Sequence, residues 1–357
     1  MYDVAIIGAG PAGSTLARLI AGRHNVLLVD KRTLTEEPTT GWEAKCCGGL
    51  LAPDAQAMLS RMRLGLPKSV LVGPQLFVVR AIDVQRRLER YYQRYYINMN
   101  RHRFDCWLLS MVPPNVELRL GWRFKSYQRH KDHFTITLVK AGKSCQEHAR
   151  ILVGADGGSS KVRKLALPGQ PFPKAYIAIQ HWLEAHHQQP YFSTLFDPEI
   201  TDYYCWTIPK EGCLIVGAAL QPRHDVTGKF ELFKSKLRDR GFHFGKLIRK
   251  EAACILRPFW PQHISTGTDG IALIGEAGGF ISPSSAEGFS YAFKSAIHLA
   301  DVLSKSPHDF EKRFRSKTRR LRANLLIKNM KSHVIYNPGL RNIVMRTGLK
   351  TMKIRHS

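Results

Sequence analysis

The most informative stretch of the chain runs from Ile271 to Ala296 and reads IALIGEAGGFISPSSAEGFSYAFKSA. It opens with the apolar run of a buried strand, continues through a glycine-rich turn that contains an acid, and enters a helix expected over Ala286–Leu303. The N-terminus has the same order of strand, turn and helix, in YDVAIIGAGPAG from Tyr2 to Gly13. Glycine-rich turns that open helices bind phosphate groups. The two motifs therefore predict that both ends of the chain contact one large phosphate-bearing ligand.

The N-terminal turn has the spacing of a dinucleotide-binding fingerprint. Gly8 allows a tight turn, Gly10 lets the backbone approach a pyrophosphate, and Gly13 lets the helix pack closely on the strand. The pyrophosphate would then bind N–H groups at the helix N-terminus. Asp30 ends the next expected strand, where its carboxylate can accept hydrogen bonds from ribose hydroxyls. The candidate cofactor contacts in this region are Gly8, Gly10, Pro11, Ala12, Gly13, Asp30 and Lys31.

A third motif, VGADGGSSKVR from Val153 to Arg163, lies between the other two. An expected strand ends in Asp-Gly, and small hydroxyl residues precede a short basic helix, which suits contacts to a nucleotide. In the 271–296 stretch, Glu276 would bond a polyol hydroxyl. These motifs favour FAD over NAD, and we expect FAD to be held non-covalently because no His or Cys lies in a recognised flavinylation context. The further candidate contacts are Asp156, Gly157, Gly275, Glu276, Ala277, Gly278 and Gly288.

Composition limits the class of protein. The chain has 357 residues, which allows one large domain or two to three smaller ones. Its seven cysteines are an odd number without CxxC pairs, which favours reduced thiols in a cytoplasmic protein over a disulfide framework or a zinc site. The sequence has no apolar run long enough for a membrane-spanning helix.

The formal net charge of +26 must affect the choice of partners. The segment 311–355 contains fourteen Lys or Arg and one acid, Glu311. Two interpretations stay open: a solvated basic helix, or contact with anionic lipid at the inner face of the membrane through Leu325, Leu326 and Ile327. Nucleic acid is a poor partner, because the chain lacks a basic–aromatic stacking platform and any known reader motif. The oligomeric state is not predicted.

The order of expected elements predicts an α/β fold, α+β overall. A Rossmann-like FAD-binding domain would be built from the discontinuous segments 1–65, 83–165 and 265–305. An inserted antiparallel sheet over 66–82 and 166–264 would form a substrate domain. A basic helical segment, 306–357, would follow, and Asn337-Pro-Gly339 is expected to be a turn within it.

Taken together, the motifs identify a resemblance to the FAD-dependent group of p-hydroxybenzoate hydroxylase-like proteins, and within it to the geranylgeranyl reductase family. The order is GxGxxG with a distal acid, then RHRFDCWL from Arg101, then GADG, then GEAGGF. KCCGGL from Lys45 resembles the family's Lys-Pro-Cys-Gly-Gly turn, and YCWTIP from Tyr204 resembles its YxWxFP element. Cys46 replaces the proline, Glu276 the usual Asp, and Gly217-Ala-Ala a GxG.

The resemblance implies an oxidoreductase that uses FAD to reduce a double bond of an apolar, isoprenoid- or lipid-like substrate. Transient NAD(P)H or another electron donor, such as ferredoxin or a quinol, would reduce the flavin. By the family pattern, Cys47, Gly48 and Gly49 would lie beside the flavin ring, and Arg101 would reach the flavin or its pyrophosphate. Tyr204 and Trp206 alternate with Cys205, so both should share one face of a strand and could wall the substrate pocket. Cys47 and Tyr204 are the candidate proton donors.

Two other functions stay open. The chain could be a flavin-dependent monooxygenase or halogenase acting on an aromatic substrate, because halogenases carry a WxWxIP element that YCWTIP matches except at one aromatic residue. It could also be an FAD-binding protein with a membrane-surface or regulatory role. Oxygen consumption coupled to modification of an aromatic compound would favour the first of these.

Overall fold

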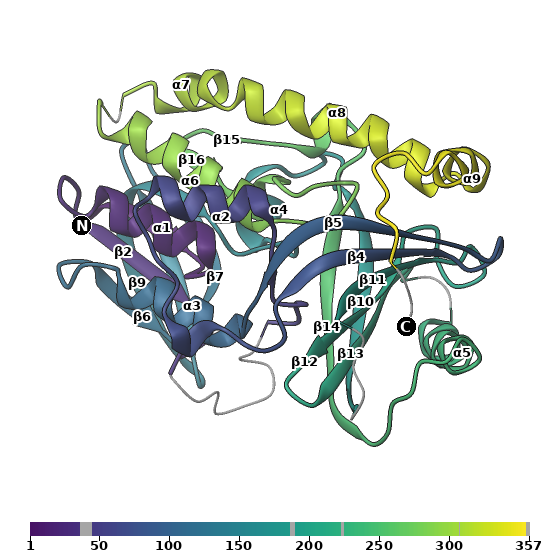
Figure 1. Cartoon of the computed structure of the whole chain (residues 1–357). Coiled ribbons are helices and arrows are strands. Elements are labelled where there is room, and N and C mark those ends of the chain that lie inside the picture. The colour runs from purple at the N-terminus through teal and green to yellow at the C-terminus, as the bar shows by residue number, and fades with distance from the viewer. Residues whose placement is uncertain (36–44, 186–189, 223–224, 307, 355–357) are drawn as a thin grey trace.

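The computed structural model describes residues 1–35, 45–185, 190–222, 225–306 and 308–354. In this part of the chain two eight-stranded sheets lie side by side, and helices cover their outer faces (Figure 1). The helices are α1 (Pro11–Ile20), α2 (Pro53–Arg61), α3 (Arg101–Ser110), α4 (Lys161–Ala166), α5 (Val226–Arg238), α6 (Phe289–Leu303), α7 (Phe310–Lys317), α8 (Arg319–Tyr336) and α9 (Pro338–Thr347). Short 3-10 turns occupy Lys68–Val70, Pro261–His263 and Gly275–Gly278.

The first sheet has the strand order β15-β16-β9-β1-β2-β6, and β7 and β8 extend it from β9 as an antiparallel meander. Its strands are β1 (Tyr2–Ile7), β2 (Val26–Asp30), β6 (Glu117–Leu120), β7 (Arg123–Arg129), β8 (Phe134–Lys140), β9 (Lys143–Gly154), β15 (Gly267–Thr268) and β16 (Ile271–Leu273). The inner strands β16, β9, β1 and β2 pair in parallel, so their carboxyl ends meet at one edge. In open α/β sheets, ligands bind at this edge.

Both faces of the first sheet are buried. One face packs against α1, α6 and α7 through Leu16, Leu299 and Phe314, and the other packs against the meander and α4 through Ile136 and Val162. This explains why the sequence of β2, VLLVD, is apolar without alternation. The predicted α/β fold class is confirmed, and strands from distant segments of the chain form this sheet.

The second sheet has the strand order β14-β10-β13-β12-β11-β4-β5-β3. Its strands are β3 (Leu50–Leu51), β4 (Leu76–Asp83), β5 (Leu88–Asn98), β10 (Lys174–Glu184), β11 (Tyr191–Phe196), β12 (Cys205–Lys210), β13 (Cys213–Leu220) and β14 (Leu247–Arg257). All described pairs are antiparallel except β11 with β4, which is parallel. The sheet is therefore mixed rather than purely antiparallel.

Two elements differ from the sequence-based expectation. β5 pairs with β4 in the second sheet, whereas the expected boundary assigned 83–165 to the cofactor domain. β5 reads LERYYQRYYIN, and this polar strand is only partly buried along most of its length, which hides its membership of a sheet. Asn337-Pro-Gly is not a free turn: the Asn337 side chain caps α9, and Pro338 occupies the first helical position.

The three C-terminal helices cross the top of the molecule in Figure 1, from the first sheet to the second. Leu321 and Leu325 of α8 pack against Phe280 and Tyr291. Further along, Arg341 of α9 forms a buried ion pair with Asp83 of β4 at 2.8 Å. The basic segment is thus an integral part of the fold. Among the described residues, no helix combines the length and apolar character needed to cross a bilayer.

Candidate functional site

The three glycine motifs converge at the carboxyl edge of the first sheet. Ile7 pairs with Gly154 in register, and Leu273 pairs with Gly154 from the other side. A Cβ added to Gly8 would lie 2.4 Å from the Ala155 carbonyl oxygen, and one added to Gly275 would lie 3.0 Å from the Cβ of Ala12. Residues far apart in the sequence therefore build one site.

The first motif fits the pyrophosphate of a dinucleotide. Gly8 has φ +111°, a conformation that L side chains rarely adopt, and a Cβ on Gly13 would lie 1.8 Å from the Gly8 carbonyl oxygen. A Cβ on Gly10 would instead meet no atom within 4 Å. In the described residues no side chain caps the N-terminus of α1, and no acid lies in its first turn. The helix end thus offers N–H groups and space to an anion.

Asp30 lies where expected, at the end of β2, but its carboxylate already accepts four hydrogen bonds. The donors are Ala9 N at 2.8 Å and three nitrogens of Arg32, its backbone N at 2.8 Å and the guanidinium Nε and Nη2 at 3.1 Å. Because a carboxylate has about four acceptor positions, a ribose hydroxyl could bond Asp30 only by displacing one of these donors. Lys31, the next candidate, is exposed.

Arg32 connects Asp30 to the helix that contains Arg101. Arg32 Nη1 lies 2.8 Å from Asp105 Oδ2, and Arg101 Nε lies 2.9 Å from Asp105 Oδ1. The guanidinium of Arg101 also stacks over the ring of Phe289, 4.8 Å from its centroid, at the start of α6. The two arginines hold the pKa of the buried Asp105 carboxyl below its usual value, against the effect of burial. Arg101 is therefore at the site, oriented by Asp105, while Arg32 and Asp105 are residues that sequence reasoning missed.

Glu276 joins the other motifs. Its Oε2 lies 3.4 Å from Nζ of Lys45, and its Oε1 accepts a hydrogen bond from Leu256 N at 3.3 Å. A Cβ on Gly158 would lie 2.8 Å from Glu276 Oε1, so the carboxylate also faces the GADG motif. Around it, Gly275, Ala277 and Gly278 are buried, and Gly288 is the N-cap residue of α6.

Asp156 has a different role from the expected nucleotide contact. Its carboxylate accepts hydrogen bonds from Ser160 Oγ at 2.5 Å, Lys161 N at 2.7 Å and Val162 N at 3.2 Å. These are the free donors at the N-terminus of α4, so the side chain shapes the turn. Gly157 has φ +81° and lies beside Lys45. The expected contact of Asp156 with a nucleotide stays a prediction.

The turn from Lys45 to Leu50 lies between the glycine motifs and the second sheet. Lys45 pairs with Glu276 on one side, while Gln180 Nε2 of β10 lies 2.9 Å from Cys46 Sγ on the other. A Cβ on Gly48 would lie 2.5 Å from Cδ1 of Ile208 in β12. Cys47 Sγ accepts a hydrogen bond from Gly49 N at 3.4 Å. None of the seven cysteines, all of which lie in the described part of the chain, forms a disulfide. Burial raises the pKa of Cys46 to about 12.

The face of the second sheet that meets this turn is apolar and aromatic. Tyr204 and Trp206 share it, with ring centroids 5.3 Å apart, whereas Cys205 faces the core beneath α5, so the predicted alternation is confirmed. Tyr204 Oη donates to the Ser285 carbonyl at 3.0 Å, within the 271–296 stretch. Burial raises the pKa of Tyr204 well above its usual value. The apolar cluster on this face contains Ala52, Leu76, Tyr96, Tyr176, Ala178, Tyr203, Trp206, Ile208, Ile215 and Ala219.

Lys210 is a further residue that sequence reasoning missed. Its side chain is buried at the end of β12, and its Nζ lies 2.6 Å from Asn98 Oδ1, 2.6 Å from the Met99 carbonyl oxygen and 3.5 Å from the Gly49 carbonyl oxygen. Burial lowers the pKa of Lys210 to about 7. The Lys210 amine therefore connects the Cys47–Gly49 turn to the end of β12 through the Gly49 carbonyl oxygen. A single lysine in a strand does not form a recognisable sequence motif. The role of Lys210 therefore becomes visible only from its burial in the structure.

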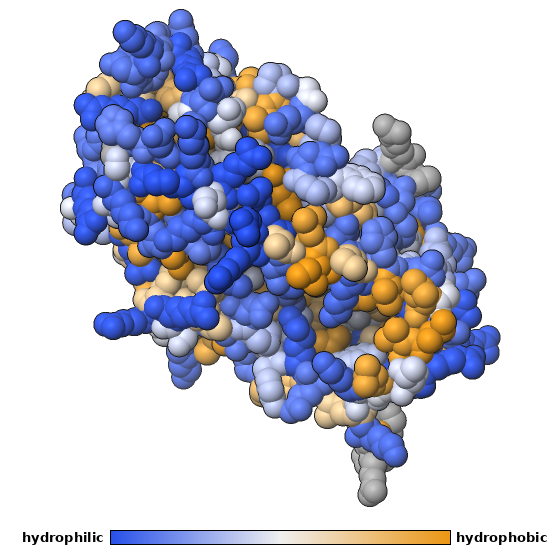
Figure 2. Space-filling model, turned by 90° about the horizontal axis from the view of Figure 1, so that it is seen from above, coloured by the Kyte–Doolittle hydropathy of each residue, from blue (hydrophilic) through white to orange (hydrophobic). Residues whose placement is uncertain are grey.

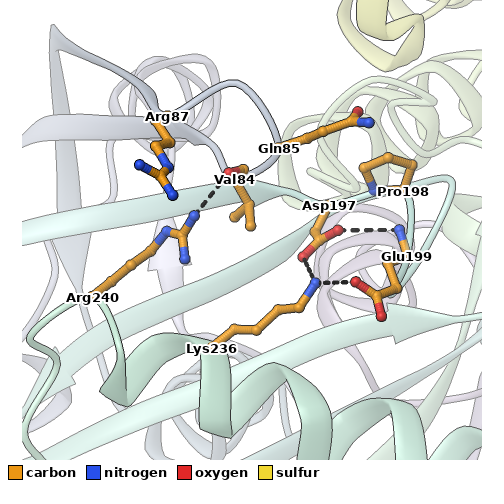
Figure 3. A pocket seen from close by; sticks show the side chains of 8 residues that line it. All are labelled: Val84, Gln85, Arg87, Asp197, Pro198, Glu199, Lys236 and Arg240. Atoms are coloured by element: carbon orange, nitrogen blue, oxygen red, sulfur yellow. Dashed lines mark hydrogen bonds and ion pairs between the residues drawn. The ribbon is translucent and has the colours of Figure 1, made fainter.

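One pocket lies apart from this site, between the ends of β4 and β11 and the helix α5 (Figure 3). Its volume is about 380 Å³. Lys236 Nζ lies 2.7 Å from Asp197 Oδ2 and also contacts Glu199, while Arg240 Nη2 donates to the Val84 carbonyl oxygen at 2.8 Å. Lys236 thus pairs with both acids of the pocket, and none of the lining residues belongs to the three motifs. The carboxyl edge of the first sheet, where the three glycine motifs meet, is therefore the candidate site.

Comparison with solved structures defines the class of fold. A geranylgeranyl bacteriochlorophyll reductase-like protein from Thermoplasma acidophilum aligns with a TM-score of 0.78 at 17% identity, over 96% of this chain and 90% of that one. PqsL, a probable FAD-dependent monooxygenase from Pseudomonas aeruginosa, aligns with a TM-score of 0.69 at 18% identity, over 98% and 100%. The halogenase PltM, solved with FAD, aligns with a TM-score of 0.70 at 16% identity, over 94% and 76%. The fold is that of the FAD-dependent oxidoreductases.

Sequence comparison then gives the family. No family model matches the chain. The CbrA proteins of Escherichia coli O157:H7 and Shigella sonnei are each 43% identical to it over 348 residues, which cover 98% of this chain and 97% of each relative. The chain belongs to the CbrA family. The run Cys47–Gln56 and the Gly-Glu-Ala turn at Gly275 already resemble CbrA, and this resemblance is confirmed.

Proposed function

We propose that the protein is an FAD-dependent oxidoreductase that reduces a double bond of an apolar, isoprenoid- or lipid-like substrate. Transient NAD(P)H or another donor would provide the electrons. One observation carries the proposal: the Lys45–Leu50 turn separates an edge suited to a dinucleotide from an aromatic, apolar sheet face. A flavin ring at this turn would face that apolar surface, which suits a hydrocarbon substrate.

The chain's own residues account for binding and orientation. The N-terminus of α1 at Gly10 would hold the pyrophosphate, and the Cys47–Gly49 turn would lie beside the flavin ring, fixed by Lys210. When bound and reduced, FAD would supply a hydride to the substrate double bond. The aromatic face would exclude water and orient the hydrocarbon.

A proton must reach the second alkene carbon for the reduction to balance. Tyr204 Oη keeps its proton at neutral pH because burial raises its pKa well above the usual value. It lies on the apolar face and is positioned by its hydrogen bond to the Ser285 carbonyl oxygen. We assign Tyr204 as the proton donor, with the Cys47 thiol as the alternative.

Spectroscopy and turnover test the proposal. The purified protein should be yellow and should release FAD on denaturation. After anaerobic reduction with dithionite, geranylgeranyl phosphate in detergent should reoxidise the flavin without oxygen, and mass spectrometry should find a product that has gained two hydrogens. A flavin that only oxygen can reoxidise would contradict reductase activity.

Tyr204→Phe should lower turnover by about 100-fold or more, because general acid catalysis contributes at least that much. FAD content should stay unchanged, since within the described part of the chain the hydroxyl bonds the Ser285 carbonyl and no glycine of the cofactor motifs. Tyr191→Phe on β11 is the matched control and should turn over normally. If Tyr204→Phe is fully active while Cys47→Ala is not, the thiol is the proton donor instead.

A monooxygenase or halogenase is the second candidate. It is favoured by the YCWTIP element of β12 and by the fold shared with PqsL and PltM. In this case, NAD(P)H oxidation would consume oxygen and an aromatic compound would gain oxygen or halogen. The reoxidation assay in air and under argon separates the two candidates directly.

A further inference from the structure

An apolar face covers the outer side of α8 and α9. We define the α8–α9 face by its exposed apolar side chains, which are Leu326, Ile327, Met330, Val334, Leu340, Ile343, Val344, Leu349 and Met352. Met330 is 72% exposed, Ile327 64% and Ile343 61%. Figure 2 shows orange residues gathered on this side of the molecule, seen from above. A patch of exposed apolar side chains on a protein surface marks an interaction site.

The spacing of these residues shows that the face is an organised feature of both helices. Ile327, Met330 and Val334 follow i, i+3, i+7 along α8, and Leu340, Ile343 and Val344 follow i, i+3, i+4 along α9. Each helix buries a different side: Leu321 and Leu325 are 6% and 2% exposed on α8, and Met345 is 3% exposed on α9. Leu325 therefore does not belong to the exposed surface, contrary to the sequence-based expectation, whereas Leu326 and Ile327 do.

The face is anchored to the core, so its orientation is fixed. Ser332 Oγ of α8 accepts a hydrogen bond from Arg257 Nη2 at 3.0 Å, and Tyr336 Oη donates to the Ser284 carbonyl oxygen at 2.7 Å. On α9, the buried Arg341–Asp83 pair fixes the helix to β4. These contacts hold the apolar stripes outward rather than letting them fold onto the protein.

The charged side chains of the segment that carries the face have one sign, and of these Lys328 pairs with Asp54 of α2. Exposed Lys331 and Arg346 flank the apolar stripes, and Lys350 and Lys353 follow α9. From 312 to 354 the sequence contains no Asp or Glu. Apolar side chains flanked by lysine and arginine suit an interface of lipid head groups and acyl chains, with the cations at the anionic head groups.

We propose that the α8–α9 face binds the protein peripherally to an anionic lipid membrane. The apolar side chains would enter the boundary between head groups and acyl chains, and the lysines and arginines would contact anionic lipid. This function goes beyond the proposed redox reaction and does not depend on it, because binding is a property of the protein surface alone.

The test is co-sedimentation of the full-length protein with vesicles. Wild type should bind vesicles of phosphatidylcholine mixed with phosphatidylglycerol, bind pure phosphatidylcholine much less, and lose affinity as salt is raised. Met330→Glu combined with Ile343→Glu should reduce partitioning on the order of 100-fold, since each change removes an exposed apolar side chain that would enter the membrane. Ile248→Glu is the matched control, because Ile248 is 55% exposed but lies on β14, and it should bind like wild type.

The charge contribution is tested separately. Lys331→Gln combined with Lys350→Gln should weaken binding to anionic vesicles by about 25-fold, about fivefold for each lysine. Lys131→Gln, an exposed lysine in the turn between β7 and β8, should change nothing. FAD content serves as the folding check for every variant. Equal binding by wild type and the α8–α9 variants, or a wild-type dimer that the variants dissociate and that ignores vesicles, would overturn the proposal.

Discussion

We expect Gly10→Val to fold normally and to be purified without FAD. A Cβ at this position meets no protein atom within 4 Å, and the backbone, with φ −78° and ψ −172°, is accessible to any residue. The valine side chain would instead occupy the space above the N-terminus of α1, where the pyrophosphate is expected. A steric clash of a few kcal/mol reduces affinity on the order of 100-fold or more.

The choice of glycine makes this experiment decisive. Gly13→Val would place its Cβ 1.8 Å from the Gly8 carbonyl oxygen, so loss of FAD there could reflect a damaged turn. Gly22→Val is the matched control, because Gly22 also has no atom within 4 Å of an added Cβ but lies after α1. We expect Gly22→Val to keep full FAD content, and both variants to unfold at similar temperatures once flavin has been removed from each. Full flavin occupancy in Gly10→Val would remove the basis for placing the pyrophosphate at α1.

The parts of the fold that sequence reasoning recovered are those encoded locally. The turn Gly8–Gly13 and the acid at the end of β2 follow from short-range backbone requirements. Helix α3 begins at Arg101, the first residue of the RHRFDCWL motif, and Asn100 caps it. Asn337 and Pro338 are a comparable local signal for the start of α9, because asparagine is common at the N-cap of a helix and proline at its first residue.

The parts that could not be recovered depend on contacts between distant segments. β5 is polar at Glu89, Gln93 and Arg94, and only its pairing with β4 shows that it belongs to the second sheet. Helix α5 ends at Arg238 and β14 begins at Leu247, where pairing with the distant strand β10 overrides local propensity. Arg32 and Asp105 meet across 73 residues, which no local pattern predicts.

The second large effect concerns Lys210, whose burial makes the stability of the protein depend on pH. Its pKa is lowered to about 7, whereas an unfolded lysine titrates near its usual 10.5. Between these two values the unfolded chain binds more protons than the native protein, so the free energy of unfolding rises as pH increases from about 7 to about 10. The full shift corresponds to at most roughly 5 kcal/mol.

Lys210→Met should remove this dependence and destabilise the protein. The variant leaves Asn98 Oδ1 and the Met99 carbonyl oxygen without the Lys210 donor, whereas the Gly49 carbonyl oxygen still accepts from Met99 N. Each unsatisfied buried acceptor costs about 1–3 kcal/mol. The deficit should be larger at pH 9 than at pH 6, because only wild type gains stability on losing the proton. Urea denaturation at pH 6, 7.5 and 9 measures the difference.

Lys131→Met, a change at an exposed lysine, is the matched control and should reproduce the wild-type pH profile.

The flavin spectrum distinguishes a role of Lys210 in positioning the turn from a role in stability alone. Gly49 has φ +62°, and a Cβ there would lie 2.3 Å from the Met99 carbonyl oxygen and 2.8 Å from Lys210 Nζ, so the turn has little room to rearrange while the amine is present. Without the amine the Cys47–Gly49 turn should loosen, and the absorbance spectrum of bound FAD should shift even at temperatures where the variant is folded. A variant with the wild-type pH slope and an unchanged flavin spectrum would show that Lys210 neither titrates in this range nor positions the turn.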